Sequence, residues 1–269
     1  MTAPTPATPD PTDSARTGQS AADPLMPARL APYDWSLYLV TDSAQCAAAG
    51  RTVPQTVAEA VAGGAGIVQI RDKHASDEEV AALTRDTIAA IEATGRTIAP
   101  AEPPASQPPV AVFIDDRLEV VRSLRAEGLD VHIHVGQTDE PVERIRAVLG
   151  PDPLVGLSAG SPAEFSVAAS LRDGSTGAAL VDLVGVGPVH DTTTKAEASA
   201  GIGPERTAAL AAIAVEMGLP AVAIGGITAD RAPALREAQL LGICVVSAIC
   251  TAADPRAAAA AIRSAYRGA

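Results

Sequence analysis

A loop rich in hydroxyl groups follows one of the most apolar runs of the chain. The run at 181–186 is typical of a buried strand, and the loop after it contains Thr192, Thr193, Thr194 and Lys195. Three hydroxyls beside their own backbone N–H groups, together with an ammonium group, suit a phosphate or diphosphate ligand. The alternative for this segment taken alone is a polar loop with nothing bound.

Polar side chains also alternate at the end of an earlier apolar run. Gln69, Arg71 and Lys73 fall on one side of an extended chain, while Ile70 and Asp72 fall on the other. Amide and cationic groups are costly to remove from water unless they meet an anion. They therefore indicate an anion site, and the alternative is an ion-pair network with nearby carboxylates.

Carboxylates end two further apolar runs. Asp115 and Asp116 close the run at 110–116, and Asp139 follows the run at 131–136. Carboxylates next to basic residues suit a Mg²⁺ ion that keeps several waters and binds diphosphate oxygens. The alternative for Asp139 is a cap on the next helix.

Glycines and single hydroxyls lie at the ends of the remaining runs. Gly225 and Gly226 end one run, and Ser158 and Ser247 lie in two others. Glycine lets the backbone approach a ligand closely, so this pair predicts a phosphate site made of backbone N–H groups.

Two histidines alternate along one run, His132 and His134. A metal pair is one interpretation, but no third soft ligand lies at a useful spacing. Hydrogen-bonding histidines in the core or at the mouth of the site are the favoured interpretation.

Eight apolar runs must position these groups, and each is followed by a helix-like segment. We expect strands at 37–42, 66–73, 110–116, 131–136, 154–160, 181–186, 221–227 and 242–249. We expect helices near 53–62, 76–93, 117–128 and 205–218, from about 140 and from 161, and near 230–238 and 254–266. Strict alternation with nearly continuous apolar strands indicates a parallel sheet covered on its outside.

Eight such units indicate a closed (β/α)8 TIM barrel, a single α/β catalytic domain over 33–269. An open doubly wound sheet is the alternative, weakened because no GxGxxG follows the first strand. Residues 1–32 are rich in Pro, Thr, Ala and Ser without a hydrophobic period, and we expect a disordered tail. The proline-rich insertion at 95–109 is expected to be exposed, on the face opposite the carboxyl ends of the strands.

The composition excludes several classes of partner. A net charge of −12 argues against a nucleic-acid groove or an anionic membrane surface. No apolar run is long enough for a membrane span, and no signal peptide is visible. Three cysteines without a CxxC pair suit a reducing compartment, so we expect a cytoplasmic protein, with Cys244 and Cys250 as small buried apolar residues. A homo-oligomer is compatible with the sequence, which does not fix the oligomeric state.

Seven short motifs together resemble thiamine-phosphate synthase, from about Leu37 to the C-terminus. They are QIRDK from Gln69, DDR from Asp115, HVGQTD from His134, GLSAG from Gly156, GVGPVHDTTTK from Gly185, AIGGI from Ala223 and VVSAI from Val245. The family joins 4-amino-2-methyl-5-pyrimidinylmethyl diphosphate to a thiazole phosphate, giving thiamine monophosphate and diphosphate. The resemblance implies a dissociative substitution with Mg²⁺, in which the diphosphate leaves before the thiazole nitrogen attacks.

The resemblance also implies roles for individual residues. Arg71, Lys73 and Lys195 would be catalytic, and Asp116 and Asp139 would bind Mg²⁺. The pyrimidine diphosphate would be held by Gln69, Ile70, Arg71, Asp72, Lys73, Asp115, Ser158 and Lys195. The thiazole phosphate would be held by Thr192, Thr194, Gly226, Val246 and Ser247, and Thr193 would be a further substrate-binding residue.

The chain departs from the family pattern at several positions. Asp115 stands where the family usually has Asn, His132 where it tends to have Gly, and His190 and Asp191 where an aromatic residue and proline are commoner. Two alternative functions stand beside the synthase. One is a thiazole tautomerase of the same superfamily, which needs no diphosphate site. The other is a non-catalytic phosphate-binding barrel, supported by the Asp115 departure and the tail.

Overall fold

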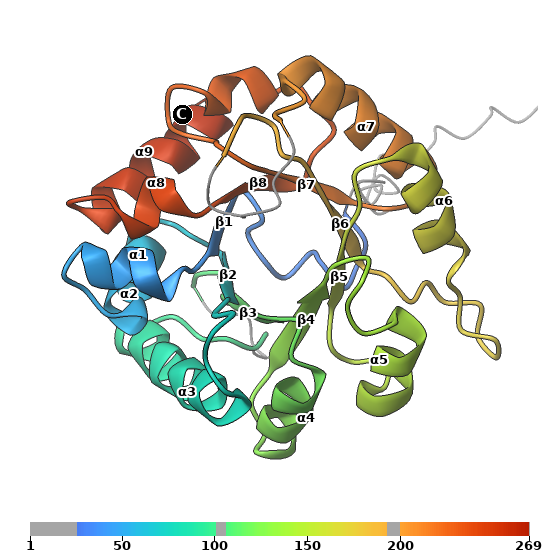
Figure 1. The fold of residues 1–269 in the computed structure, drawn as a ribbon, viewed down its shortest axis with the longest axis horizontal. Coiled ribbons are helices and arrows are strands. Elements are labelled where there is room, and N and C mark those ends of the chain that lie inside the picture. Colours follow the sequence, from blue (N-terminus) through green and yellow to red (C-terminus); the bar gives the residue numbers. More distant parts are fainter. Residues whose placement is uncertain (1–25, 101–105, 193–199, 269) are drawn as a thin grey trace, which may run out of the picture.

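Eight parallel strands form a closed barrel in sequence order, with β8 paired to β1 (Figure 1). The structure is a computed structural model and describes residues 26–100, 106–192 and 200–268. The strands are β1 Leu37–Val40, β2 Ile67–Ile70, β3 Ala111–Asp115, β4 Val131–Val135, β5 Val155–Ser158, β6 Leu183–Val186, β7 Ala221–Ile224 and β8 Gly242–Val245. The predicted TIM barrel is confirmed, and the open doubly wound sheet is wrong.

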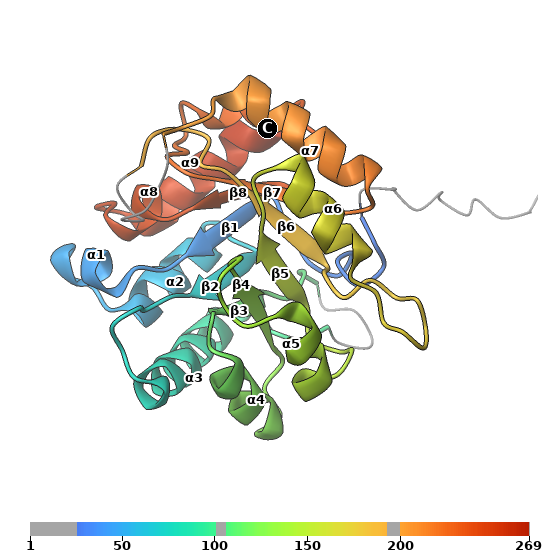
Figure 2. The ribbon, with the colours of Figure 1, turned by 45° about the vertical axis from the view of Figure 1, so that its right-hand side comes forward.

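Helices surround the outside of the barrel (Figure 2). They are α1 Ser43–Ala48, α2 Val53–Ala62, α3 Asp77–Ala93, α4 Leu118–Ala126, α5 Val142–Leu149, α6 Pro162–Ser170, α7 Pro204–Glu216, α8 Ser247–Cys250 and α9 Pro255–Arg267. Ser76 and Glu79 form the expected capping box at the start of α3, and Ser161 caps α6. None of the helices in the described residues is long and apolar enough to cross a membrane.

Two elements near the C-terminus differ from the sequence prediction. The helix expected at 230–238 is one 3₁₀ turn, η1 Ala232–Leu235, with a proline inside it. The strand expected to reach residue 249 ends at Val245, because the Val246 carbonyl accepts the N–H groups of Ile249 and Cys250 and turns the chain into α8. Short apolar runs fit a strand or a buried helix equally well, so the sequence pattern does not separate the two.

Alternation along the strands divides the core into two parts. Outward side chains such as Val112 and Ile114 pack in the layer between the barrel and the helices. Inward side chains such as Tyr38 and Phe113 fill the barrel interior. All three cysteines are buried and form no disulfide, and the burial agrees with the expectation for Cys244 and Cys250.

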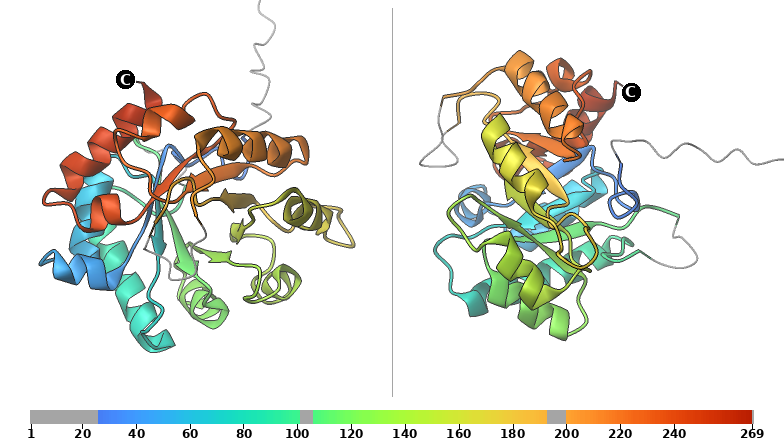
Figure 3. Two further views of the ribbon diagram at one scale, coloured as in Figure 1. Left: turned by 45° about the horizontal axis from the view of Figure 1, so that its top comes forward. Right: turned by 90° about the vertical axis from the view of Figure 1, so that its right-hand side faces the viewer.

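The segment at 26–35 closes the amino-terminal end of the barrel (Figure 3). Leu30 is fully buried, and the Trp35 indole N–H donates to the Leu30 carbonyl at 2.9 Å. Arg29 pairs with Asp182 at 2.9 Å and donates to the Pro151 carbonyl ahead of β5. The expected tail boundary at residue 32 is therefore wrong for residues 26–32. A segment this short that packs through single apolar residues shows no hydrophobic period in the sequence. Residues 1–25 lie outside the described chain.

His132 is buried in this end of the barrel. Its Nδ1 accepts the Leu154 N–H at 3.2 Å, and its Nε2 lies 3.4 Å from the Tyr33 hydroxyl. Burial lowers the pKa of His132 to about 4, so the ring is neutral near pH 7. The prediction of a hydrogen-bonded core histidine is confirmed.

The proline-rich segment precedes β3, at the amino-terminal end of the barrel. Its described parts, 95–100 and 106–109, contain no helix or strand, as expected. Residues 101–105 lie outside the described chain.

Candidate active site

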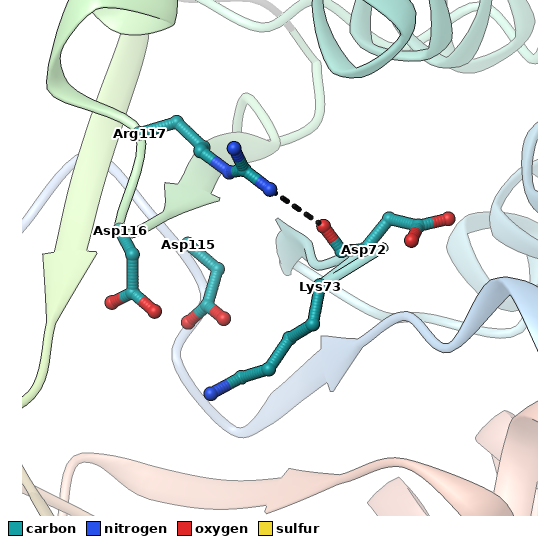
Figure 4. A pocket seen from close by; sticks show the side chains of 5 residues that line it. All are labelled: Asp72, Lys73, Asp115, Asp116 and Arg117. Atoms are coloured by element: carbon teal, nitrogen blue, oxygen red, sulfur yellow. Dashed lines mark hydrogen bonds between the residues drawn. The ribbon is translucent and has the colours of Figure 1, made fainter. Parts of the chain in front are cut away.

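A cavity of about 300 Å³ opens at the carboxyl ends of β2 and β3 (Figure 4). It is lined by Asp72, Lys73, Asp115, Asp116 and Arg117. Strand register explains why these loops meet: Ile70 pairs with Ile114, so the residues that follow each strand emerge side by side. Four of the five residues belong to the predicted site, and Arg117 does not.

Arg71 forms an ion pair with Asp115. The Arg71 Nε lies 3.1 Å from Asp115 Oδ2, and both side chains are largely buried, at 17% and 15% exposed. The Arg71 backbone N–H donates to the Thr41 hydroxyl at 3.1 Å. The ion pair that the sequence offered as an alternative is therefore present. The pairing is through the Arg71 Nε.

The neighbours of Arg71 occupy three different environments. Gln69 is 4% exposed and donates to the Tyr38 hydroxyl at 3.2 Å, which places it below the mouth of the barrel. Ile70 points outward into the layer under the helices. The Asp72 carboxylate accepts the N–H groups of His74 and Ala75, so it shapes its own loop.

Lys73 extends toward the two carboxylates of the DDR motif. Figure 4 shows its ammonium group directed at Asp115 and Asp116, with the Asp72 side chain turned the other way. The positive charge of Lys73 works against the other influences on Asp116, because it lowers the pKa of that carboxyl.

Asp116 lies in an unusual backbone conformation and an unusual electrostatic environment. Its φ of 61° is in the left-handed region, which Asp tolerates better than most residues. Burial and the nearby carboxylates of Asp115 and Asp139 raise the pKa of Asp116 to about 7, and its side chain shares a hydrogen bond with Asp139. Like charges held this close favour either a shared proton or a bound cation.

Asp139 does not cap the next helix. Its Oδ2 accepts the Gly136 N–H at 2.8 Å, and α5 begins later, at Val142, without a side-chain cap. The helix-cap alternative is therefore wrong. The Gly136 bond instead folds the loop after β4 so that Asp139 faces Asp116.

Ser158 lies across the barrel, at the end of β5. Its hydroxyl is 3.1 Å from His134 Nε2, and its carbonyl accepts the Gln137 side-chain amide at 2.7 Å. A Cβ at Gly156 would lie 2.3 Å from His134 Nδ1, so only glycine leaves room for the imidazole there. Among the described residues, no group of three or more His, Cys, Asp or Glu side chains could hold a metal ion, and the predicted hydrogen-bonding role of His134 is confirmed.

The expected phosphate loops lie around β7 and β8. Gly225 and Gly226 have φ values of 111° and 60°, and a Cβ at Gly226 would lie 2.8 Å from the His190 Cβ. Val246 precedes α8 and Ser247 begins it. Thr192 is within the described chain, whereas the predicted ligands Thr193, Thr194 and Lys195 lie outside it.

The sequence prediction missed two residues that shape the site. Thr41 fixes the backbone of Arg71, and Arg117 contacts the loop that carries Lys73. Both residues lie next to features that the sequence does show, because Thr41 comes at the end of the first strand and Arg117 is the last residue of the DDR motif. Their contacts join loops from different strands, which no local pattern reveals.

Comparison with known proteins agrees with this geometry. The family model described as thiamine monophosphate synthase matches residues 37–249. A thiamine-phosphate synthase of Azorhizobium caulinodans is 38% identical over 87% of this chain and 95% of its own length. Another, from Xanthobacter autotrophicus, is 40% identical over 87% and 96%.

A solved structure points the same way. Thiamine phosphate pyrophosphorylase from Pyrococcus furiosus superposes with a TM-score of 0.67 at 26% identity, covering 88% of this chain and 98% of that one. The match between sequence, fold and strand-end cavity shows that the chain belongs to the thiamine monophosphate synthase family.

Proposed function

We propose that this protein couples 4-amino-2-methyl-5-pyrimidinylmethyl diphosphate to a thiazole phosphate, giving thiamine monophosphate and diphosphate. The curated relatives at 38% and 40% identity are named for this synthase activity. The observation that carries the proposal is the cavity lined by Lys73, Asp115 and Asp116 at adjacent strand ends, with Arg71 paired to Asp115 beside it.

Lys73 in the cavity and Arg71 beside it suit a diphosphate leaving group. The Arg71 guanidinium, held beside Asp115, carries several N–H donors in a planar fork that suits diphosphate oxygens. Lys73 adds a mobile positive charge from the neighbouring loop (Figure 4). Together they offset the negative charge that develops as the bond from the pyrimidine methylene carbon to the diphosphate oxygen breaks.

Asp116 and Asp139 would hold the Mg²⁺ ion that the family resemblance implies. The residues fit a divalent cation, because burial together with the carboxylates of Asp115 and Asp139 raises the pKa of Asp116 to about 7, and a cation would relieve the repulsion between these carboxylates. Two carboxylates leave most coordination positions to water and phosphate oxygens, as Mg²⁺ prefers. When bound, the ion would neutralise part of the diphosphate charge.

Bond formation needs no nucleophile from the protein. The five residues that line the cavity carry carboxylates and cations, without a hydroxyl, thiol or imidazole. In a dissociative substitution, the electron-rich aminopyrimidine stabilises the methylene cation and the thiazole nitrogen then attacks it. The protein contributes orientation, charge stabilisation and exclusion of water.

The two alternative functions are less well supported. A thiazole tautomerase requires a phosphate site but not the set of Arg71, Lys73, Asp116 and Asp139 found here. A non-catalytic barrel does not account for the clustered carboxylates that raise the pKa of Asp116. The relatives given above are also named as synthases.

The direct test is to mix the purified protein with both substrates and Mg²⁺ and to measure thiamine monophosphate and diphosphate by mass spectrometry. We expect both products in equal amounts, and neither when one substrate is omitted. Arg71→Ala and Lys195→Ala should lose most of kcat/KM while keeping the circular dichroism spectrum. No thiamine monophosphate from the folded wild-type protein would refute the proposed function.

A further inference from the structure

The loop that carries Lys73 is held in place by side chains. Residues 71–76 lie in neither a helix nor a strand. The Asp72 carboxylate binds the backbone N–H groups of His74 and Ala75, at 3.0 and 3.1 Å. These bonds satisfy two backbone donors of the loop from within, and carbonyl groups of the loop are bound from elsewhere.

Arg117 supplies the missing bonds from the next strand. Its Nη2 donates to the Ala75 carbonyl at 3.0 Å and to the Asp72 carbonyl at 3.4 Å, and its Nη1 pairs with Asp77 Oδ1 at 2.8 Å. The guanidinium therefore contacts the loop on both sides of Lys73 (Figure 4). Its planar fork suits several acceptors fixed in one geometry.

The position of Arg117 is not explained by the helix that follows it. Arg117 stands immediately before α4 and makes no side-chain cap. A cation at a helix amino terminus is unfavourable, because that end carries a partial positive charge. The contacts with the Lys73 loop are what this arginine provides.

Arg117 also follows directly on Asp116. The Asp116 backbone N–H is fixed to the His134 carbonyl at 3.0 Å, in the left-handed conformation described above. A firmly held residue thus anchors the arginine, and the arginine anchors the loop of Lys73.

We propose that Arg117 is a positioning residue that acts through Lys73, holding the loop so that the ammonium group faces the diphosphate site. This inference rests on the proposed synthase function. Lysine has a long, flexible side chain, so its placement depends on a fixed backbone. Figure 4 shows the Lys73 side chain directed away from Arg117 and toward Asp115 and Asp116, so the two cations do not share a target.

A double-mutant cycle tests this inference. We expect Arg117→Ala to lower kcat/KM by roughly 10- to 100-fold, the range for a displaced catalytic group. In a Lys73→Ala background, the same substitution should change kcat/KM by no more than about twofold, because the group it positions is gone. Independent effects that multiply in the double variant, or wild-type kcat/KM in Arg117→Ala, would overturn the proposal.

Matched variants separate positioning from a general loss of structure. Arg122→Ala removes an arginine of α4 whose exposed partner is Glu119 at 2.7 Å, and it should leave kcat/KM unchanged. Asp77→Asn keeps both contacts of Arg117 with the loop carbonyls, so it should lower kcat/KM only a few-fold. Arg117→Lys should keep more activity than Arg117→Ala. It replaces Arg117→Ala in the double-mutant cycle if that variant does not fold.

Hydrogen exchange supplies a measurement that is independent of turnover. The amides of His74 and Ala75 should exchange faster in Arg117→Ala than in Arg122→Ala, because their loop has lost its outer support. Unchanged exchange would refute the role of Arg117 in holding the loop, even if activity falls. If the wild-type protein makes no product, the proposed function fails, while the exchange result still decides whether Arg117 holds the loop.

Discussion

The negative charge of Asp116, placed for function, lowers the stability of the folded protein, and Asp116→Asn measures this loss of stability. The pKa of Asp116 rises from 3.8 to about 7 on folding, first through burial and then through the carboxylates of Asp115 and Asp139. The folded chain therefore binds a proton more tightly than the unfolded chain, and stability falls as pH rises from about 4 to about 7. Asparagine removes the charge and accepts the left-handed φ of 61° as readily as aspartate does.

The size of the effect follows from the pKa. Three pKa units correspond to about 4 kcal/mol for a fully buried group. Asp116 is half-buried, so solvent screens part of the repulsion and we expect about 1 to 2 kcal/mol. For a chain of this size, the melting temperature of Asp116→Asn should rise by about 3 to 6 °C above pH 7.

The assay is thermal unfolding followed by circular dichroism at several pH values, without Mg²⁺. The rise in melting temperature caused by Asp116→Asn should be full above about pH 7. It should vanish near pH 4, where the wild-type carboxyl is already protonated. Adding Mg²⁺ should stabilise the wild type more than the variant. Asp130→Asn is the control, because Asp130 pairs with Arg125 at 2.9 Å and neutralising it removes an attraction. A variant no more stable than the wild type above pH 7 would show that the reasoning about repulsion is wrong.

Four further outcomes are expected. Chelating Mg²⁺ with EDTA should abolish product formation and adding Mg²⁺ back should restore it, whereas full activity in EDTA would refute the assignment of the metal ligands. Asp115→Asn should lower the KM for the pyrimidine diphosphate a few-fold in steady-state assays, because one negative charge facing the anion is lost while an acceptor for Arg71 remains; a raised KM would contradict this. The pKa of His132 falls from 6.5 to about 4 on folding, so wild-type stability should drop by about 3 kcal/mol as pH falls through that window, and urea unfolding of His132→Asn should show a flatter dependence. Asp182→Ala leaves Arg146, its partner at 2.6 Å, buried without a counter-charge, and should lower the free energy of unfolding in urea by about 3 to 5 kcal/mol, whereas a loss below about 1 kcal/mol would contradict a structural role for the pair.

The barrel could be predicted from the sequence because its signals are local. Apolar runs alternate with amphipathic segments, and residues such as Ser76 and Ser161 mark where helices begin. These signals depend only on neighbours in the chain. The bounds of most helices and strands therefore lie within a few residues of their expected positions.

The contacts inside the site could not be predicted, because they depend on register between strands. Arg71 meets Asp115 only because Ile70 pairs with Ile114, and the sequence alone does not fix that pairing. Arg117 reaches the Lys73 loop from a different strand, and its motif gave no sign of the contact. The segment at 26–35 was assigned mostly to the tail for a similar reason, since it packs through single anchors without any period.

The burial of Trp35 at the closed end of the barrel has a practical consequence. It is the only tryptophan of the chain, 1% exposed, with its ring edge-on to Tyr33 at 6.3 Å and to Phe113 at 6.1 Å. Its emission will therefore report detachment of the amino-terminal segment. Since Trp35 lies at the end opposite the strand-end cavity, substrates and cations bound there should leave the fluorophore almost undisturbed. One optical signal can thus follow unfolding while ligands are titrated at the opposite end.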